Sequence, residues 1–219
     1  MEAMRAVEGF DADGSRRPLP VERRDDTLQL FAESGLTDRL TLQVKADWQS
    51  GSDLFADYEG RGPVEIGVRW QAWRADNAAI SLYGGYALAG EGRNAGYAAP
   101  GAGDGDWELR LLAGRSGQVA GRDTFVEVQL ARVFRDGLPD EDRLDVTSGV
   151  RLGENWMLLT QTYAGRTAED RDSWWINNES SIVRHFGEWS LQAGWRQAVA
   201  GQGDVPAQSG PIVAVWRRF

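Results

Sequence analysis

The chain has 219 residues, which is enough for one sizeable domain, and a formal net charge of −9. That charge argues against nucleic acid as a partner, because no basic cluster is available to displace the counterions of phosphate. The absence of cysteine excludes disulfides and thiolate metal sites, and no run of about 18 apolar residues suggests a membrane-spanning helix. The mean hydropathy of −0.46 still allows a membrane location, because a barrel strand presents only every second side chain to lipid.

The first residues do not form the basic and then apolar segment that directs export across an inner membrane. We expect such a segment to have been removed, or the start of the chain to be displaced. We expect Glu2 to Val7 to be the upper part of a first strand whose lower part precedes this sequence. Residues 8–26 are then expected to be an extracellular loop, and residues 27–219 to form the rest of a single barrel domain.

Alternation of apolar and polar residues predicts about eleven strands in the remaining chain. The clearest runs from Leu40 to Gln49, where apolar residues occupy one face and Thr41, Gln43, Lys45 and Asp47 the other. About ten alternating residues are what a tilted transmembrane strand needs. The expected strands cover residues 28–35, 40–49, 64–73, 80–88, 107–114, 126–130, 144–152, 156–164, 174–183, 189–196 and 211–219. Because bacterial single-chain barrels have an even number of strands, we predict an all-β, antiparallel, up-and-down transmembrane barrel of about twelve strands.

The predicted connections alternate between short turns and longer loops rich in glycine and acidic residues. The short turns are expected at residues 35–38, 74–77, 117–123, 153–155 and 185–188, and the long loops at 51–62, 90–106, 135–143, 166–172 and 200–210. Short turns on the periplasmic side and long loops on the extracellular side are typical of outer-membrane barrels.

Tryptophan is frequent and is found close to the predicted strand ends. Residues of this kind form belts at the two membrane interfaces, although tryptophan is also common in β-proteins generally. We expect Trp73, Trp156 and Trp189, together with Trp216, near the periplasmic interface, and Trp48, Trp107, Trp174 and Trp175 near the extracellular one.

Two short motifs resemble bacterial outer-membrane β-barrels of the small transporter-like or porin-like kind. The hairpin Glu33-Ser34-Gly35-Leu36-Thr37-Asp38-Arg39-Leu40-Thr41-Leu42 is similar to the one that opens such barrels, and the chain ends Val215-Trp216-Arg217-Arg218-Phe219. The resemblance implies that Phe219, with Trp216, is part of the signal read by the barrel-assembly machinery. It also implies a Gram-negative outer-membrane location, with the lipid bilayer and lipopolysaccharide as surroundings. Arg217 departs from the pattern, since an aromatic or apolar residue usually stands two places before the end. We expect Phe219 to close the last strand at the periplasmic rim and to pair with the N-terminal strand.

The polar faces of the predicted strands carry charges of both signs. The residues expected to line the lumen are Lys45, Asp47, Glu65, Arg69, Glu108, Arg110, Glu127, Asp145, Arg151, Glu179 and Arg196. Isolated buried charges are prohibitively costly, so these groups must pair with one another or with water. Two interpretations follow: a lumen plugged by mutual ion pairs, in a structural or interaction barrel with acidic extracellular loops, or a narrow aqueous path that selects small polar solutes.

We predict no catalytic residues, cofactor or metal site. His185 is the only histidine, and it falls at a predicted periplasmic turn with Ser180 and Ser181 nearby but no nucleophile motif. A soluble barrel that holds an apolar ligand is a further alternative, because alternation by itself permits either orientation of the strands. That alternative requires Leu40, Leu42, Val44 and Trp48 inside, and Lys45 and Asp47 outside.

Overall fold

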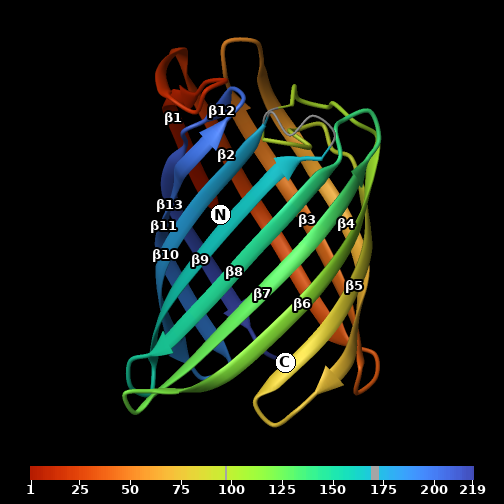
Figure 1. Cartoon of the computed structure of the whole chain (residues 1–219), viewed down its shortest axis with the longest axis vertical. Helices are drawn as coiled ribbons and strands as arrows, with labels where there is room; N and C mark the ends of the chain where they lie inside the picture. The colour runs from red at the N-terminus through yellow and green to blue at the C-terminus, as the bar shows by residue number, and fades with distance from the viewer. Residues whose placement is uncertain (97, 169–172) are drawn as a thin grey trace.

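The computed structural model describes residues 1–96, 98–168 and 173–219. Twelve long antiparallel strands and one short extra strand form a single closed barrel (Figure 1). The strands are β1 Glu2–Phe10, β2 Arg16–Gly35, β3 Leu40–Ser52, β4 Asp57–Arg74, β5 Ala78–Leu88, β6 Gly105–Val119, β7 Arg122–Arg135, β8 Glu141–Arg151, β9 Trp156–Thr167, β10 Trp174–Phe186, β11 Trp189–Gln202, β12 Val205–Pro206 and β13 Ser209–Arg217. The predicted fold is therefore confirmed. Among the described residues, no helix is long and apolar enough to cross a membrane.

Each long strand pairs with its neighbour in the sequence, and β1 closes the ring between β2 and β13. The connections at the lower end in Figure 1 are residues 36–39, 75–77, 120–121, 152–155 and 187–188, which agrees with the predicted short turns. Two of them, 120–121 and 187–188, have only two residues, and in Ala120-Gly121 both residues have positive φ (50° and 75°). Such a turn matches the right-handed twist of the two strands that it joins.

The strands reach higher on the loop side than the sequence predicts. Residues 8–26 are not a loop: β1 and β2 form a hairpin that turns at residues 11–15. The predicted loops 51–62, 135–143 and 200–210 likewise shorten to 53–56, 136–140 and the segment around β12, whereas the loop before β6 spans residues 89–104 as expected. Above a membrane both faces of a strand contact water, so alternation fades there although the hydrogen-bonded ladder continues. Of the predicted loop 166–172, residues 169–172 lie outside the described residues.

The N-terminal strand includes Glu2 to Val7, as the sequence predicts. Within the described residues β1 pairs with residues 16–27 of β2, and meets β13 through Glu2 opposite Ile212 and Arg5 opposite Ser209. Phe219 follows the end of β13 at Arg217, and its ring is packed under the Arg217 guanidinium, 4.8 Å away. The expected pairing of Phe219 with the N-terminal strand is not among these pairs and stays a prediction.

A small apolar core lies inside the barrel toward the end with the short turns. Met157, Leu159 and Val183 are buried there, and Phe125 packs against them. The ring of Phe125 occupies the space above Gly149, where a Cβ would meet it at 2.2 Å. This core fills one side of the lumen and leaves the open space nearer the loops.

Candidate functional site in the barrel interior

The strands turn their polar faces inward and their apolar faces outward. On β6, Glu108 is 7% exposed whereas the adjacent Leu109 is 59% exposed. On β3, Lys45 lines the interior cavity and Trp48 is exposed on the outside. A soluble barrel with an apolar interior needs the opposite orientation, so that alternative is excluded.

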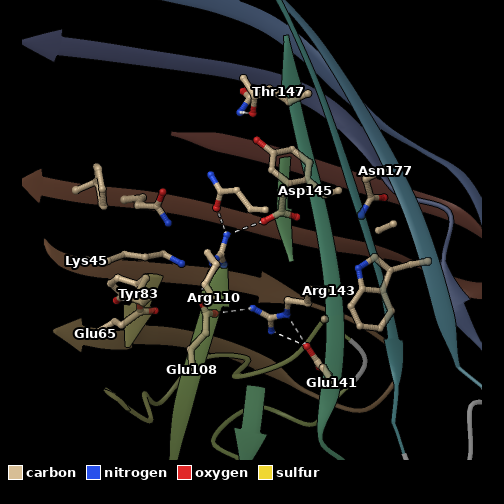
Figure 2. Close-up of a pocket in the computed structure, with 18 of the residues that line it drawn as sticks. Lys45, Glu65, Tyr83, Glu108, Arg110, Glu141, Arg143, Asp145, Thr147 and Asn177 are labelled. Atoms are coloured by element: carbon tan, nitrogen blue, oxygen red, sulfur yellow. Dashed lines mark hydrogen bonds and ion pairs between the residues drawn. The ribbon is translucent and has the colours of Figure 1, made fainter. Parts of the chain in front are cut away.

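The interior contains a cavity of about 690 Å³ (Figure 2). Its wall consists of side chains from β2 to β10, and Ala95 with Gly96 of the loop between β5 and β6, together with the short strand β12, lie against its loop side. Seven of the predicted lumen residues line it: Lys45, Glu65, Arg69, Glu108, Arg110, Glu127 and Asp145. Amide and aromatic side chains complete the wall, among them Gln29, Gln43, Gln129, Gln161, Asn177, Phe31, Tyr83, Tyr163 and Trp175.

The other four predicted lumen residues lie on inward faces without lining this cavity. Asp47 accepts a hydrogen bond from Gln29 at 3.0 Å. Glu179 and Arg196 form a separate buried cluster, described below. Arg151 is exposed at the short-turn end of β8, on the same face as Asp145.

Arg110 is the centre of the main ion network in the cavity. Its guanidinium contacts Glu108 at 2.6 Å and Asp145 at 2.9 Å, and also donates to Gln129. Tight pairing on both sides holds the guanidinium in one orientation, since charge-assisted hydrogen bonds of this kind are strong and directional.

Sequence reasoning missed two charged residues of the same wall. Arg143 pairs with Glu141 at 2.5 Å, and Glu141, only 1% exposed, also receives Arg135 at 2.6 Å. Both fall in the predicted loop 135–143, but in the structure β8 begins at Glu141 and includes them. The spacing of two residues from Glu141 to Arg143 to Asp145 is the signal that extends the inward face upward.

Some charges that face the cavity are not neutralised by an ion pair in the described part of the chain. Lys45, the only lysine, extends its side chain into the cavity (Figure 2). The Glu65 carboxylate accepts a hydrogen bond from the Tyr83 hydroxyl, and the Glu127 carboxylate accepts one from the side-chain amide of Gln129. These groups are available to a charged or dipolar solute in the cavity.

The buried cluster around Glu179 lies next to the first strand. Glu179 is 2% exposed and accepts hydrogen bonds from Ser181 at 2.9 Å, Gln192 at 3.0 Å and Arg196 at 2.7 Å. Arg196 also contacts Glu2 of β1 at 2.8 Å. The cluster joins β10 and β11 to β1 across the place where the barrel closes.

The tryptophans divide between the outer and the inner surface. Trp48 and Trp107 are exposed toward the loop end, and Trp73, Trp156 and Trp189 toward the short-turn end, as two belts require. The assignment of Trp175 to a belt is wrong, because Trp175 lines the cavity. Neighbouring residues of a strand point to opposite faces, so Trp174 and Trp175 cannot both face lipid.

His185 lies on an inward face near the short-turn end, where its Nδ1 is 2.8 Å from the Ser190 hydroxyl. Its neighbour is therefore Ser190, and not Ser180 or Ser181. A nucleophile activated by histidine also requires a third group that orients the ring. Within the described residues, the buried Nε2 atom has no hydrogen-bond partner.

No protein-family model and no curated protein matches the sequence. Among solved structures, the chain is similar to an outer membrane channel from Pseudomonas putida F1, with a TM-score of 0.73, 13% identity, and coverage of 98% of this chain and 91% of the other. It is also similar to the NanC porin, with a TM-score of 0.62, 7% identity, and coverage of 100% and 99%. The chain therefore has the porin-like β-barrel fold seen in outer-membrane channels.

Proposed function

We propose that the chain is an integral barrel of the Gram-negative outer membrane that acts as a narrow channel for small polar solutes. The observation that carries this proposal is the cavity of about 690 Å³, walled by charged and amide side chains inside a barrel whose apolar side chains face outward. A lining of this kind replaces part of the hydration of a polar solute and repels apolar ones. The shared fold with two channels is consistent with it. Lipid, lipopolysaccharide and the barrel-assembly machinery are the partners that this location requires, with Phe219 and Trp216 as the proposed assembly signal.

The second candidate is a structural or interaction barrel whose lumen is closed by its own ion pairs. The contacts of Arg110 with Glu108 and Asp145, and of Arg143 with Glu141, favour this candidate because they pair charged side chains with one another along the cavity wall, and the contact of Arg110 with Asp145 spans from β6 to β8. The two candidates differ in whether ions pass through the purified protein.

Conductance in planar lipid bilayers separates the two. We expect the full chain, refolded from denaturant into detergent and reconstituted, to give small, uniform single-channel steps. Arg69→Ala and Arg110→Ala remove guanidinium groups from the cavity wall and should enlarge those steps. If neither the unmodified chain nor the Arg110→Ala variant conducts, the channel proposal is wrong and the closed barrel is supported.

Ion selectivity should depend on Lys45. Replacing this ammonium by a carboxylate in Lys45→Glu changes the charge at the cavity wall by two units. A unit charge at contact distance in water is worth about 1 kcal/mol, so the ratio of cation to anion permeability should rise about fivefold or more. The reversal potential in a salt gradient measures this ratio.

Two control variants accompany the Lys45→Glu experiment. Lys45→Gln should give an intermediate ratio. Arg39→Glu, in the exposed turn 36–39 at the short-turn end, should leave the ratio close to that of the unmodified chain. Equal ratios for Lys45→Glu and Arg39→Glu would mean that permeating ions do not pass Lys45.

A further inference from the structure

Part of the loop between β5 and β6 is folded into the mouth of the barrel. We call residues 90–96 the mouth segment. Ala95 is 7% exposed, and Ala95 and Gly96 lie against the cavity lined by Lys45 and Arg110. A solute that enters from the loop end must therefore pass this segment.

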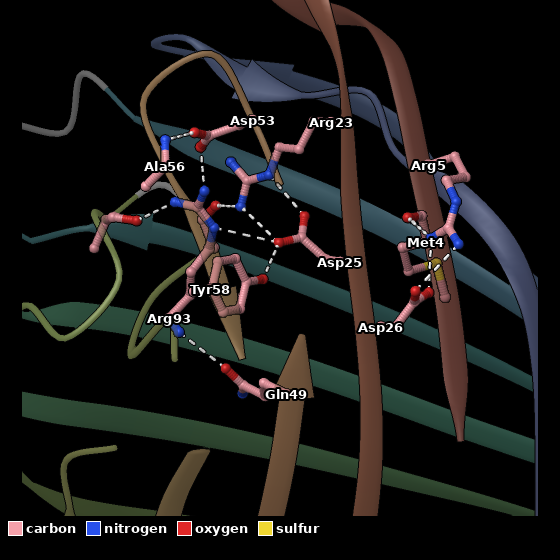
Figure 3. A network of polar contacts seen from close by, with 12 residues as sticks. Met4, Arg5, Arg23, Asp25, Asp26, Gln49, Asp53, Ala56, Tyr58 and Arg93 are labelled. Carbon is pink, nitrogen blue, oxygen red and sulfur yellow. Dashed lines mark hydrogen bonds and ion pairs between the residues drawn. The ribbon is translucent and has the colours of Figure 1, made fainter. Parts of the chain in front are cut away.

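One side of the mouth segment is attached to β2 and to the loop between β3 and β4 by four charged side chains (Figure 3). We call Arg23, Asp25, Asp53 and Arg93 the ion cluster. The Arg93 side chain is only 7% exposed; its Nε lies 3.3 Å from Asp25, and it also pairs with Asp53. Arg23 binds the other oxygen of Asp25 at 2.6 Å and donates to the backbone oxygen of Gly96.

Two neutral groups support the ion cluster. The Tyr58 hydroxyl donates to Asp25 at 2.5 Å, and the side-chain oxygen of Gln49 accepts the backbone N–H of Arg93 at 2.9 Å. Asp53 lies in the turn 53–56. Burial favours a higher pKa for Asp53, but the N–H groups of Phe55 and Ala56 and the charge of Arg93 outweigh burial and lower its pKa. The cluster thus consists of two cations and two anions that satisfy one another.

The other side of the mouth segment is attached to the far wall. Arg135 of β7 donates to the backbone oxygen of Asn94, while its guanidinium pairs with Glu141 and with Asp106 at 3.2 Å. β2 and β7 are separated by four strands in the ring. The mouth segment is therefore held from two separate parts of the barrel wall, through Arg93 and Gly96 on the side of β2 and through Asn94 on the side of β7.

The segment also lies close to the barrel wall through its glycines. A Cβ at Gly90 would meet the backbone oxygen of Arg61 at 2.3 Å, and a Cβ at Gly92 would meet the Gln49 side chain at the same distance. The backbone contact leaves no room for a side chain at Gly90, whereas a side chain at Gly92 would require the end of the Gln49 side chain to move. The inward path of the segment is thus built into its sequence as well as into the ion cluster.

We propose that the mouth segment sets the aperture of the channel and that the ion cluster holds it in the narrow position. This inference rests on the proposed channel function. Loss of the Arg93 side chain removes the link to Asp53 and Asp25, but Asp25 keeps Arg23 and Tyr58, and the strand ladders do not involve this side chain. The barrel should therefore persist while the segment, which keeps only the contacts of Arg23, Arg135 and Gln49 with its backbone, is loosened.

The first test measures conductance of the full chain with Arg93→Ala in planar bilayers. The expected result is a single-channel conductance about twofold or more above that of the unmodified chain, with entry of larger sugars in liposome-swelling assays. Arg74→Ala, at the opposite end of the barrel, is the matched control and should change neither. Unchanged conductance and unchanged size limit in folded Arg93→Ala would overturn the proposal.

A disulfide supplies the reverse test, because the chain has no native cysteine. A Cβ built at Gly60 lies 3.0 Å from the Cβ of Glu91, which is close to the usual range for a disulfide once the neighbours relax slightly. Gly60→Cys with Glu91→Cys, added to Arg93→Ala, should give the narrow conductance when oxidised and the wide one when reduced. Equal conductance in both states, with the disulfide verified by mass, would contradict the proposal.

A readout without conductance separates this inference from the channel function. Ala95→Cys gives one buried thiol, which should react slowly with a polar maleimide in the unmodified background and about tenfold faster or more with Arg93→Ala, in proportion to how often the segment is open. If the chain does not conduct but this difference is found, the channel function fails while the attachment of the segment stands. Equally slow labelling in both backgrounds would show that the ion cluster does not hold the segment.

Discussion

Arg196→Ala is expected to destabilise the folded barrel by about 3–5 kcal/mol, because it leaves a buried carboxylate without its counter-ion. Glu179 is 2% exposed and takes two hydrogen bonds from the Arg196 guanidinium, at 2.7 and 3.0 Å. The substitution also removes the link from Arg196 to Glu2 at 2.8 Å and its stacking over Tyr163. Since this cluster joins β11 to β1, the loss should weaken the closure of the ring.

Urea unfolding of the protein folded into phospholipid vesicles measures this change, with tryptophan fluorescence as the signal. The control is the double variant Glu179→Gln with Arg196→Met, which removes both charges and keeps most of the volume. It should recover a large part of the loss, because a buried pair replaced as a whole costs much less than a buried pair that is broken. If Arg196→Ala and the double variant lose the same stability, charge is not what the cluster contributes.

The transmembrane part of the barrel could be predicted from the sequence because a strand between lipid and a polar interior must alternate. The run from Leu40 to Gln49 shows this on β3, where Lys45 faces the cavity and Trp48 the outside. The same rule identified seven residues of the cavity wall. Trp175 was assigned to a belt because it lies near a predicted loop. Alternation with Trp174 would have placed it inside the barrel, where it lines the cavity.

The part above the transmembrane strands could not be predicted in the same way. Arg16 to Pro20 belongs to β2, yet two prolines and water on both sides leave no alternation to read. Glu141 and Arg143 were missed for another reason: they continue the two-residue spacing of Asp145 along β8, but they fall in a segment that was predicted to be a loop.

The mouth segment is a different case, because its position depends on contacts between residues far apart in the sequence. Arg93 pairs with Asp53, 40 residues away, and Arg135 binds the backbone of Asn94, 41 residues away. No local pattern specifies such partners. The elements that limit access to the cavity were thus the least predictable part of the candidate site.

An arginine placed on the outer surface of the transmembrane wall should be far more damaging than an arginine placed inside. Leu111 lies in a row of exposed leucines on four neighbouring strands, opposite Leu82 on one side and Leu130 on the other, with Leu144 beyond. A row of exposed leucines is unfavourable in water, whereas the hydrocarbon of a bilayer requires an apolar outer surface of this kind. Leu111→Arg should therefore cost about 2–4 kcal/mol when the protein is folded into vesicles.

The matched control is Gln161→Arg, which places the same side chain on β9 but in the polar cavity. It should change stability by only about 0.5 kcal/mol, because the new guanidinium keeps water and nearby carboxylates as partners. Urea titration in vesicles compares the two variants directly. If Leu111→Arg is as stable as Gln161→Arg, and stays monomeric in buffer without detergent, then the outer leucines do not face lipid and the membrane location is wrong.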